Sequence, residues 1–473
     1  MHAKLLCLSA LALSLSACSS LAPTYERPAA PVPAAWPTGA AYAAPTAAAV
    51  AAADVPWQSF ILDARLRSVI DQALSNSRNL RETIASIESA RAQYRVQRAA
   101  ELPTIDAGVS GSSARSLSST NGHANTSTVS HSYTADVGLS AYEIDLFGRV
   151  RSLTEAALET YLSTEEAARS TRISLIAETA TAWLTLAADR NRLAISQKTL
   201  DAAKRSMDLT RRRMEAGVDS RVDVRSAETI YQQARSDIAS TATAIAQDRN
   251  ALELLVGAPV ADTLLPDELP PTEHWLAEVP AGLSSEVLLR RPDVLEAEHQ
   301  LKSANANIGS ARAAFFPKLS LTATGGVASA ALSTLVSGGA SVWTLAPSLS
   351  LPIFDGGANR ANLAYAKAQQ KLYVATYELA VQTAFKEVAD ALAARGTMAE
   401  QLAAQKDLVA AAADSSELST LRYEKGVDTF LTALTSQRTL YSAQLTRVTT
   451  QLAALSNQVT LYKALGGGLA TGS

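Results

Sequence analysis

The chain carries one long pattern twice, and this internal duplication constrains its fold more than any other feature. Two stretches of 68 residues, free of Pro and nearly free of Gly, are each followed by a Gly and a clean stretch of 39: first 149–216, Gly217 and 218–256, then 358–425, Gly426 and 427–465. The second copy lies 209 residues after the first, and Gly396 is its one interruption. At about 1.5 Å per residue, a helix over the longer stretch would extend about 100 Å.

Two matching short segments join the helices of each half. Arg213–Asp219 aligns with Arg422–Asp428, so that a Gly and a following Val-Asp pair stand at the same place in both. Gly accepts the positive φ that ends a helix, and we expect Asp219 and Asp428 to cap the helix that follows. The sequence pattern of each half therefore predicts a long helical hairpin.

The duplication divides the chain into parts. The segment before the first hairpin, Asn79–Pro103, matches Asp293–Pro317 before the second. Residues near the start are rich in Pro and Ala, which is typical of an extended segment with little core, and folded structure is expected to begin near Trp57 and Phe60. The predicted parts are a signal peptide 1–17, a Pro/Ala-rich strap 18–56, a first repeat 57–257, a connector 258–283, a second repeat 284–465 and a tail 466–473.

The N-terminus has the form of a bacterial lipoprotein signal. Lys4 precedes an apolar stretch that ends in Leu15-Ser16-Ala17-Cys18, which predicts cleavage before Cys18. The cysteine would then carry S-diacylglycerol on its thiol and an acyl group on its new amino terminus. The alternative is an ordinary signal peptide with a chance Cys, and the complete spacing of the motif argues against it. Cys7 leaves with the signal, so the mature chain could form no intrachain disulfide.

Four segments alternate apolar and polar residues with the period of a β-strand. They lie at 132–142, around Ile105–Val109, around Leu319–Ala323 and from Trp343 to Leu351, and two of them belong to each repeat. Ser/Gly/Thr-rich tips at 111–131 and 325–340 would join them. Strands of about ten residues, apolar on one face and polar on the other, are typical of outer-membrane proteins, although a soluble half-buried sheet has the same pattern.

The predicted lipid anchor favours the membrane reading of these strands. Beyond residue 17 no run of 18 apolar residues is available for a membrane helix. Four strands cannot enclose a channel, and an open sheet edge in hydrocarbon would leave backbone groups without partners. We therefore expect the chain to share its barrel with copies of itself. Three copies would give about twelve strands and six long hairpins.

Several segments of the chain together match one known family. They are the lipoprotein motif, Trp57-Gln58-Ser59-Phe60 with Asp63 and Leu66, Glu143–Gly148, Arg291–Val294, Ala311–Pro317, Leu351–Gly357 and Leu461–Gly466. On these segments the chain resembles the outer-membrane efflux ducts of the TolC type, and most closely their lipoprotein branch, typified by OprM and the NodT family. The order and spacing of the segments match from Cys18 to about Gly468.

This resemblance implies a mainly α-helical protein with a membrane β-barrel, in which a homotrimer forms a 12-stranded barrel continuous with a long α-helical periplasmic tunnel. It implies the exit duct of a tripartite drug efflux pump, lipid-anchored in the outer membrane and extending into the periplasm. The implied partners are a periplasmic adaptor protein and an inner-membrane transporter of the resistance-nodulation-division class.

The resemblance also places a gate and a docking surface at the two hairpin turns. The gate candidates are Asp219, Asp223, Asp428, Leu431, Thr435 and Arg438. Relatives carry an acid where this chain has Thr435, which argues against an acidic ring at that level, while Leu431 and Arg438 match the family. The adaptor is expected to meet the turns at Gly217, Val218, Gly426 and Val427. In the alternative reading, Asp219 and Asp428 only cap helices.

Other classes of function have little support in the sequence. Five His residues, His2, His123, His131, His274 and His299, form no ligand motif, and no phosphate-binding loop or nucleophile elbow is present, so neither a metal nor a cofactor beyond the lipid is expected. With 42 basic and 45 acidic residues, nucleic acid is not expected as a partner either. The alternatives that stay open are an exporter of proteins or metal ions and a coiled-coil stalk lipoprotein without a pore.

Overall fold

A computed structural model describes residues 20–42, 55–120, 123–272, 275–277 and 284–468 of the chain. The lipidation candidate Cys18 lies outside these residues. The α-helices of the described residues are α2 (Trp57–Phe60), α3 (Ala64–Asn76), α4 (Arg78–Ala99), α5 (Arg149–Glu215), α6 (Arg221–Val256), α7 (Pro292–Ala313), α8 (Ala358–Glu424) and α9 (Phe430–Ala464). The strands are β1 (Ile105–Thr120), β2 (His123–Ile144), β3 (Lys318–Ser329) and β4 (Ala340–Ser350). Among the helices described, none is both long enough and apolar enough to cross a bilayer.

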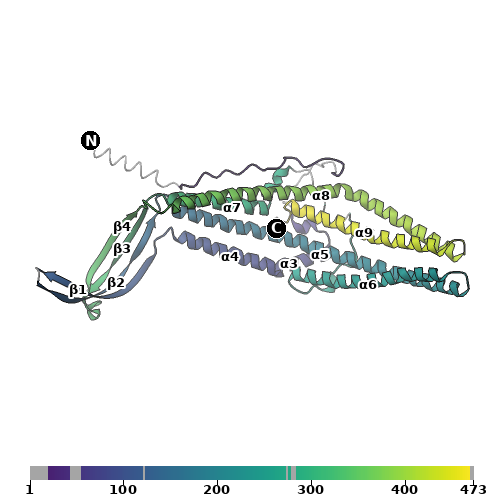
Figure 1. Ribbon diagram of the computed structural model, residues 1–473, viewed down its shortest axis with the longest axis horizontal. Helices are drawn as coiled ribbons and strands as arrows, with labels where there is room; N and C mark the ends of the chain where they lie inside the picture. The colour runs from purple at the N-terminus through teal and green to yellow at the C-terminus, as the bar shows by residue number, and fades with distance from the viewer. Residues whose placement is uncertain (1–19, 43–54, 121–122, 273–274, 278–283, 469–473) are drawn as a thin grey trace. The chain divides into compact units, whose positions relative to one another are not determined.

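The two helical hairpins predicted from the duplication are confirmed (Figure 1). Helices α5 and α8 are each 67 residues long, α6 and α9 are 36 and 35, and α4 and α7, which precede the strands of each repeat, are each 22. Gly217 and Gly426 end the long helices with φ of 77° and 76°. The matching helix lengths, which differ by at most one residue, and the matching turns show that the duplication seen in the sequence is also a structural repeat.

The prediction that Asp219 and Asp428 cap the next helices is wrong. Helix α6 is capped by Ser220, which forms a capping box with Asp223, and α9 is capped by Thr429. Each Asp instead accepts from the Arg six residues before it, Asp219 from Arg213 at 3.1 Å and Asp428 from Arg422 at 3.2 Å. The Asp residues therefore close the turn back onto the preceding helix, because a hydroxyl one residue later already satisfies the new helix.

The four predicted strands are confirmed as one antiparallel sheet in the order β1-β2-β3-β4 (Figure 1). Residues directly opposite one another share a face. The register aligns Ala107, Val137, Gly325 and Trp343 in one row, and the next residues along, Asp106, Gly138, Thr324 and Thr344, in a row on the other face. The apolar face is open in the single chain, since Trp343 is 78% exposed and Val109 is 74% exposed.

Two details of the strands differ from the prediction. Strands β1 and β2 contain 16 and 22 residues instead of about ten, so most of the predicted loop 111–131 is paired strand. Similarly, β3 continues to Ser329, into the predicted loop 325–340. Alternation through 132–142 also fails at its end, because the register shifts between Leu139 and Tyr142 and Ala141 takes a φ of 52°. Ser- and Thr-rich segments can form strands, but they lack the alternation of apolar and polar residues by which a strand is recognised in a sequence.

The chain forms two compact units, and each repeat contributes to both. The first comprises the described residues of 1–28, 87–164 and 297–377 and includes the sheet. The second comprises the described residues of 29–86, 165–296 and 378–473 and includes both hairpin turns. In the first, the strap residues Tyr25 and Arg27 bind Glu298. In the second, the ring of Phe60 stacks on Tyr462 with centroids 3.9 Å apart, and Trp57 is fully buried, as predicted for the start of the folded body.

Candidate functional site at the hairpin turns

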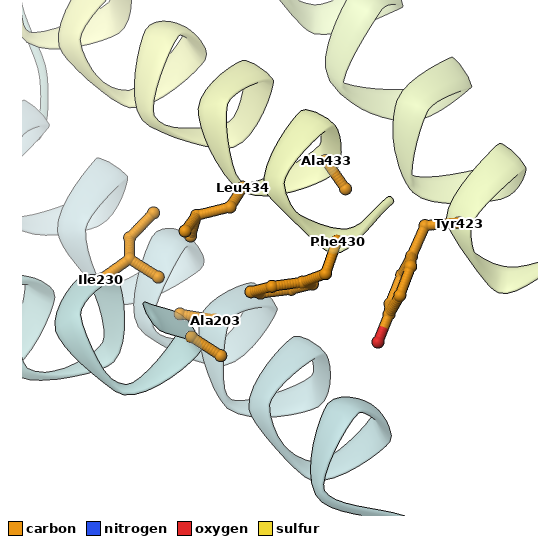
Figure 2. Close-up of a cluster of buried hydrophobic side chains, with 7 residues drawn as sticks. Ala203, Ile230, Tyr423, Phe430, Ala433 and Leu434 are labelled. Atoms are coloured by element: carbon orange, nitrogen blue, oxygen red, sulfur yellow. The ribbon is translucent and has the colours of Figure 1, made fainter. Parts of the chain in front are cut away.

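The two hairpins pack together close to their turns around a buried apolar cluster. Helices α5 and α6 contribute Ala203, Ala227 and Ile230, and helices α8 and α9 contribute Tyr423, Phe430, Ala433 and Leu434. Figure 2 shows Ile230 and Ala203 of the first hairpin facing Leu434 and Phe430 of the second, with the Tyr423 ring beside Phe430. Because these side chains would be exposed if the hairpins separated, the cluster holds the two hairpins of the chain together near their turns.

A polar contact joins the hairpins beside this cluster. The hydroxyl of Tyr423 donates to the carboxylate of Asp219 and lies 3.0 Å from the hydroxyl of Thr210. The guanidinium of Arg213 sits 4.6 Å from the centre of the Tyr423 ring and donates to the same carboxylate. Burial, and then the bond to Asp219, raise the pKa of Tyr423 to about 12. Tyr423 therefore stays neutral and remains a donor at physiological pH.

The sequence argument missed Tyr423, although a signal was present. The matched turns differ at few positions, and one of them is Tyr423, which aligns with Met214 in the first repeat. An aromatic hydroxyl at one of two otherwise equivalent places indicates a contact that only one hairpin makes. Its acceptor Asp219 is 204 residues away, which local pattern alone does not reveal.

The structure shows where each predicted gate residue lies. Leu431 is 65% exposed, and Val222, its equivalent in the first repeat, is 71% exposed. Arg438 donates to Thr229 at 2.5 Å and so joins α9 to α6. Asp219 accepts from Tyr423 of the other hairpin, as described above. The last three candidates bond within their own hairpin: Asp223 to Ser220, Asp428 to Arg422 and Thr432, and Thr435 to the carbonyl of Leu431.

The charge at Asp428 is held in place by its neighbours. The backbone N–H of Thr429, followed by the hydroxyl of Thr432 and the guanidinium of Arg422, lower the pKa of this carboxyl. Asp428 is therefore ionised throughout the physiological range.

The docking candidates Val218 and Val427, next to the turn glycines, are 63% and 64% exposed. The turns thus present apolar side chains beside fixed charges, a combination suited to contacts with another protein.

A second contact between the hairpins lies farther from the turns. Tyr441 of α9 donates to Asp237 of α6 at 2.6 Å, and its hydroxyl lies 2.9 Å from that of Ser196 on α5. Burial, and then the bond to Asp237, raise the pKa of Tyr441 to about 12. A cavity of about 460 Å³ lies between α5, α8 and α9 and extends from Tyr423 to Tyr441. The hairpins are therefore held together at discrete points with incompletely filled space between them, which makes their separation easier.

Asp248 of α6 is an acidic group whose pKa is strongly affected by its surroundings. Its Oδ2 is buried and has no hydrogen-bond partner among the described residues. Burial, and after it the negative charge of Asp189 on α5, raise the pKa of Asp248 to about 6, while Arg192 opposes the rise. Arg192 also binds Asp189 and reaches Thr449 on α9 at 3.1 Å. A proton at Asp248 therefore relieves repulsion at a point where three helices meet.

We expect the free energy of unfolding to fall as the pH rises from about 4 to about 6. The folded state binds a proton at Asp248 more tightly than the unfolded state, so stability is lost as that proton leaves. Asp248→Asn should remove this dependence and stabilise the protein at pH 7 by about 1 kcal/mol, after the shift is discounted for solvent screening. Denaturant unfolding of both proteins from pH 4 to pH 7 measures this. Parallel curves for wild type and Asp248→Asn would contradict it.

In the described part of the chain, no group of three or more His, Cys, Asp or Glu side chains is arranged to hold a metal ion. The buried charges bind one another instead. Arg291, for example, is buried and binds Asp293, Glu387 and the carbonyl of Ala464. These groups support the fold of the second unit and leave the hairpin turns as the candidate functional site.

Comparison with known proteins identifies what this architecture resembles. The family model described as outer membrane efflux protein matches residues 69–258 and 283–467. The antibiotic efflux pump outer membrane protein ArpC of Pseudomonas putida is 48% identical over 469 residues, 99% of this chain and 96% of that protein. The toluene efflux pump outer membrane protein TtgC, also of Pseudomonas putida, matches equally well: 48% over 469 residues, with the same coverage of both chains. The open state of the Neisseria gonorrhoeae MtrE outer membrane channel is 38% identical, covers 95% of this chain and 99% of that one, and gives a TM-score of 0.83.

Proposed function

The chain belongs to the outer membrane efflux protein family, and we propose that it is the exit duct through which a tripartite pump expels antibiotics and other toxic small molecules. It is an outer-membrane channel that extends into the periplasm, and it conducts without catalysing a reaction. The observation that carries the proposal is the pairing of a sheet that is apolar on one exposed face with two long hairpins whose turns present apolar and charged side chains.

Trimeric assembly follows from the edges of the sheet. Strands β1 and β4 are the outer strands, and each has one edge that no described strand covers. In hydrocarbon such an edge costs several kcal/mol for each unpaired group, so β1 of one copy must pair with β4 of the next. Three copies close a twelve-stranded barrel with the row of Asp106 and Thr344 lining its lumen. The row of Trp343 then faces lipid.

The chain works with energised partners that supply the cargo. A passive duct has no energy source of its own. We therefore assign it a periplasmic adaptor protein and an inner-membrane transporter of the resistance-nodulation-division class as partners. The adaptor meets the exposed turns around Val218 and Val427. The relatives named above serve antibiotic and toluene pumps, which supports lipophilic small molecules as cargo over proteins or metal ions.

Bilayer recordings and an efflux assay together test this function. Purified protein in a planar bilayer should produce discrete conductance steps. The absence of any conductance would instead favour the alternative in which the hairpins form a coiled-coil stalk without a pore. In cells that lack the gene, accumulation of a fluorescent lipophilic drug should rise and return to normal when the gene is restored. Unchanged drug accumulation together with altered export of a protein or metal would instead identify a different cargo.

Replacing either turn glycine by Val should weaken adaptor binding about ten-fold and leave trimer yield largely unchanged. Gly217 and Gly426 have φ of 77° and 76°, where a β-branched side chain is strained, and a Cβ at either position would meet no atom within 4 Å. The cost is therefore a distorted turn and not a clash in the core. Efflux and adaptor affinity measure the effect.

The matched control is Gly217→Asn, because Asn tolerates the left-handed conformation and should retain most of the binding. Crosslinkers placed at positions 215–219 should capture the adaptor in an active pump. Equal adaptor affinity for the Val and Asn variants, or an active pump without crosslinks, would refute docking at these turns.

A further inference from the structure

The β1–β2 hairpin continues well beyond the other two strands of the sheet. The outermost pair between β2 and β3 is Tyr133 with Ser329, whereas β1 and β2 stay paired as far as Thr120 and His123. At about 3.3 Å per residue, β2 extends roughly 30 Å past β3. We call the paired residues 112–116 and 128–132 the hairpin extension; its side chains are exposed.

One face of this extension continues the lipid-facing surface and then changes its chemistry. Val109 lies opposite Ala135, Gly111 opposite Tyr133, Ser113 opposite His131 and Arg115 opposite Val129. Because alternate pairs share a face, all of these side chains lie on the same side of the hairpin. Moving outward along the hairpin, this side passes from apolar through an aromatic residue to two basic side chains.

Tyr133 marks the boundary between the apolar and the basic part. Its ring lies over Gly111, where a Cβ would come within 3.1 Å of the ring carbons. A Tyr that ends an apolar band is the residue typical of the membrane–water interface, because its ring is apolar and its hydroxyl is polar. His131 and Arg115, two and four pairs farther out, then lie at the level of the lipid headgroups.

Connectivity places this end of the hairpin on the outer side of the membrane. The opposite ends of β1 and β2 lead into helices α4 and α5, which belong to the periplasmic part of the chain. The headgroups next to Arg115 and His131 are therefore those of the outer leaflet, which in an outer membrane are phosphorylated glycolipids. Phosphate is the group that Arg binds best, through several charged hydrogen bonds.

The geometry points to a lipid-binding site that lies outside the duct: we propose that Arg115 and His131 bind a phosphate group of an outer-leaflet glycolipid. Arg115 donates from one Nη to Ser127 at 2.8 Å, which orients the guanidinium and leaves its other donors exposed. The Nδ1 of His131 lies 2.8 Å from the hydroxyl of Ser113, which turns Nε2 away from the strand. On this face of the extension no described side chain is acidic, so nothing in it neutralises the two bases.

The opposite face of the extension provides the matched control. Ser112 lies opposite Ser132 and Ala114 opposite Ser130, all of them uncharged and directed toward the lumen side. The experiment measures binding of diphosphoryl lipid A in detergent micelles to the full-length purified trimer. It compares wild type, Arg115→Ala, the double variant Arg115→Ala/His131→Gln, and the control double variant Ser112→Ala/Ser132→Ala.

Arg115→Ala should weaken lipid A binding about ten-fold, and the basic double variant should bind no better than wild type binds dephosphorylated lipid A. The Ser control should bind as wild type does. Equal binding by all variants, or the same loss in the Ser control, would overturn the site. Displacement of lipid A by millimolar inorganic phosphate would show a site for a free anion and also overturn it. Single-channel conductance of the same preparations tests the duct function separately. Failure of the lipid-binding proposal would therefore not refute the proposed channel, and failure of the channel would not refute lipid binding.

Discussion

Replacing Leu431 by Ser should raise single-channel conductance several-fold and sensitise cells to large antibiotics. Leu431 is 65% exposed in one chain, which leaves its side chain available to meet its counterparts across a threefold axis. An apolar ring at that place excludes water and ions, and a hydroxyl in its stead admits them. We propose that this end is a two-state element, so that removing apolar contacts from its closed state would shift the population toward the open state.

Two other substitutions make the Leu431 result specific. Leu408→Ser changes an exposed leucine of α8 outside the hairpin turns and should leave conductance unchanged. Val222→Ser changes the equivalent residue of the first repeat, and a smaller increase there would show that both hairpins contribute apolar side chains to the constriction. If wild type and Leu431→Ser conduct equally in the same bilayer, Leu431 is not the constriction.

Cys18→Ala should abolish incorporation of radiolabelled fatty acid into the protein completely. We propose that Cys18 carries both S-diacylglycerol and an amide-linked acyl chain, and no other residue of the mature chain can carry the thioether, because Cys7 leaves with the signal. The described strap begins two residues later, where Ser20 lies 3.0 Å from Ser152 and the carbonyl of Leu21 accepts from Arg312. The strap is therefore held against α5 and α7 from Ser20 onward.

Cys7→Ala serves as the control, since it should leave labelling intact. With a different signal peptide supplied, the Cys18→Ala chain should still assemble, because the barrel provides a second attachment to the membrane. Label that persists in Cys18→Ala would show that the lipid is elsewhere. Labelling lost from both variants would point to a defect in export and not in acylation.

Regular features of this fold could be predicted from the sequence, and irregular ones could not. Gly217 and Gly426 marked both turns because a positive φ leaves a recognisable residue. The caps were displaced by one residue because Asp219 and Ser220 are both residues that cap helices well, and Asp219 instead accepts from Arg213 and Tyr423. Ala141 was placed with its alternating neighbours because its positive φ is set by the pairing of β2 with β3, which no local pattern records.

Some residues of the candidate site could be predicted from the sequence, and the contacts between the two hairpins could not. Exposed apolar residues at the turns, such as Val427 and Leu431, could be located because the turn itself was located. The contacts that hold the hairpins together could not, since Tyr423 with Asp219 and Arg438 with Thr229 join residues more than 200 positions apart. Such pairs depend on how two helices are rotated about their axes, and the helical repeat alone does not fix that rotation.

The two uncovered edges of the sheet have a genetic consequence. Because the outer edges of β1 and β4, which no described strand covers, are proposed to pair with other copies, one chain with a damaged edge strand is expected to disrupt every barrel it enters. When equal amounts of damaged and normal chain mix at random, only about one assembly in eight contains three normal chains. Edge-strand alleles of this gene are therefore expected to be dominant over the wild type, whereas alleles that prevent export of the chain are expected to be recessive.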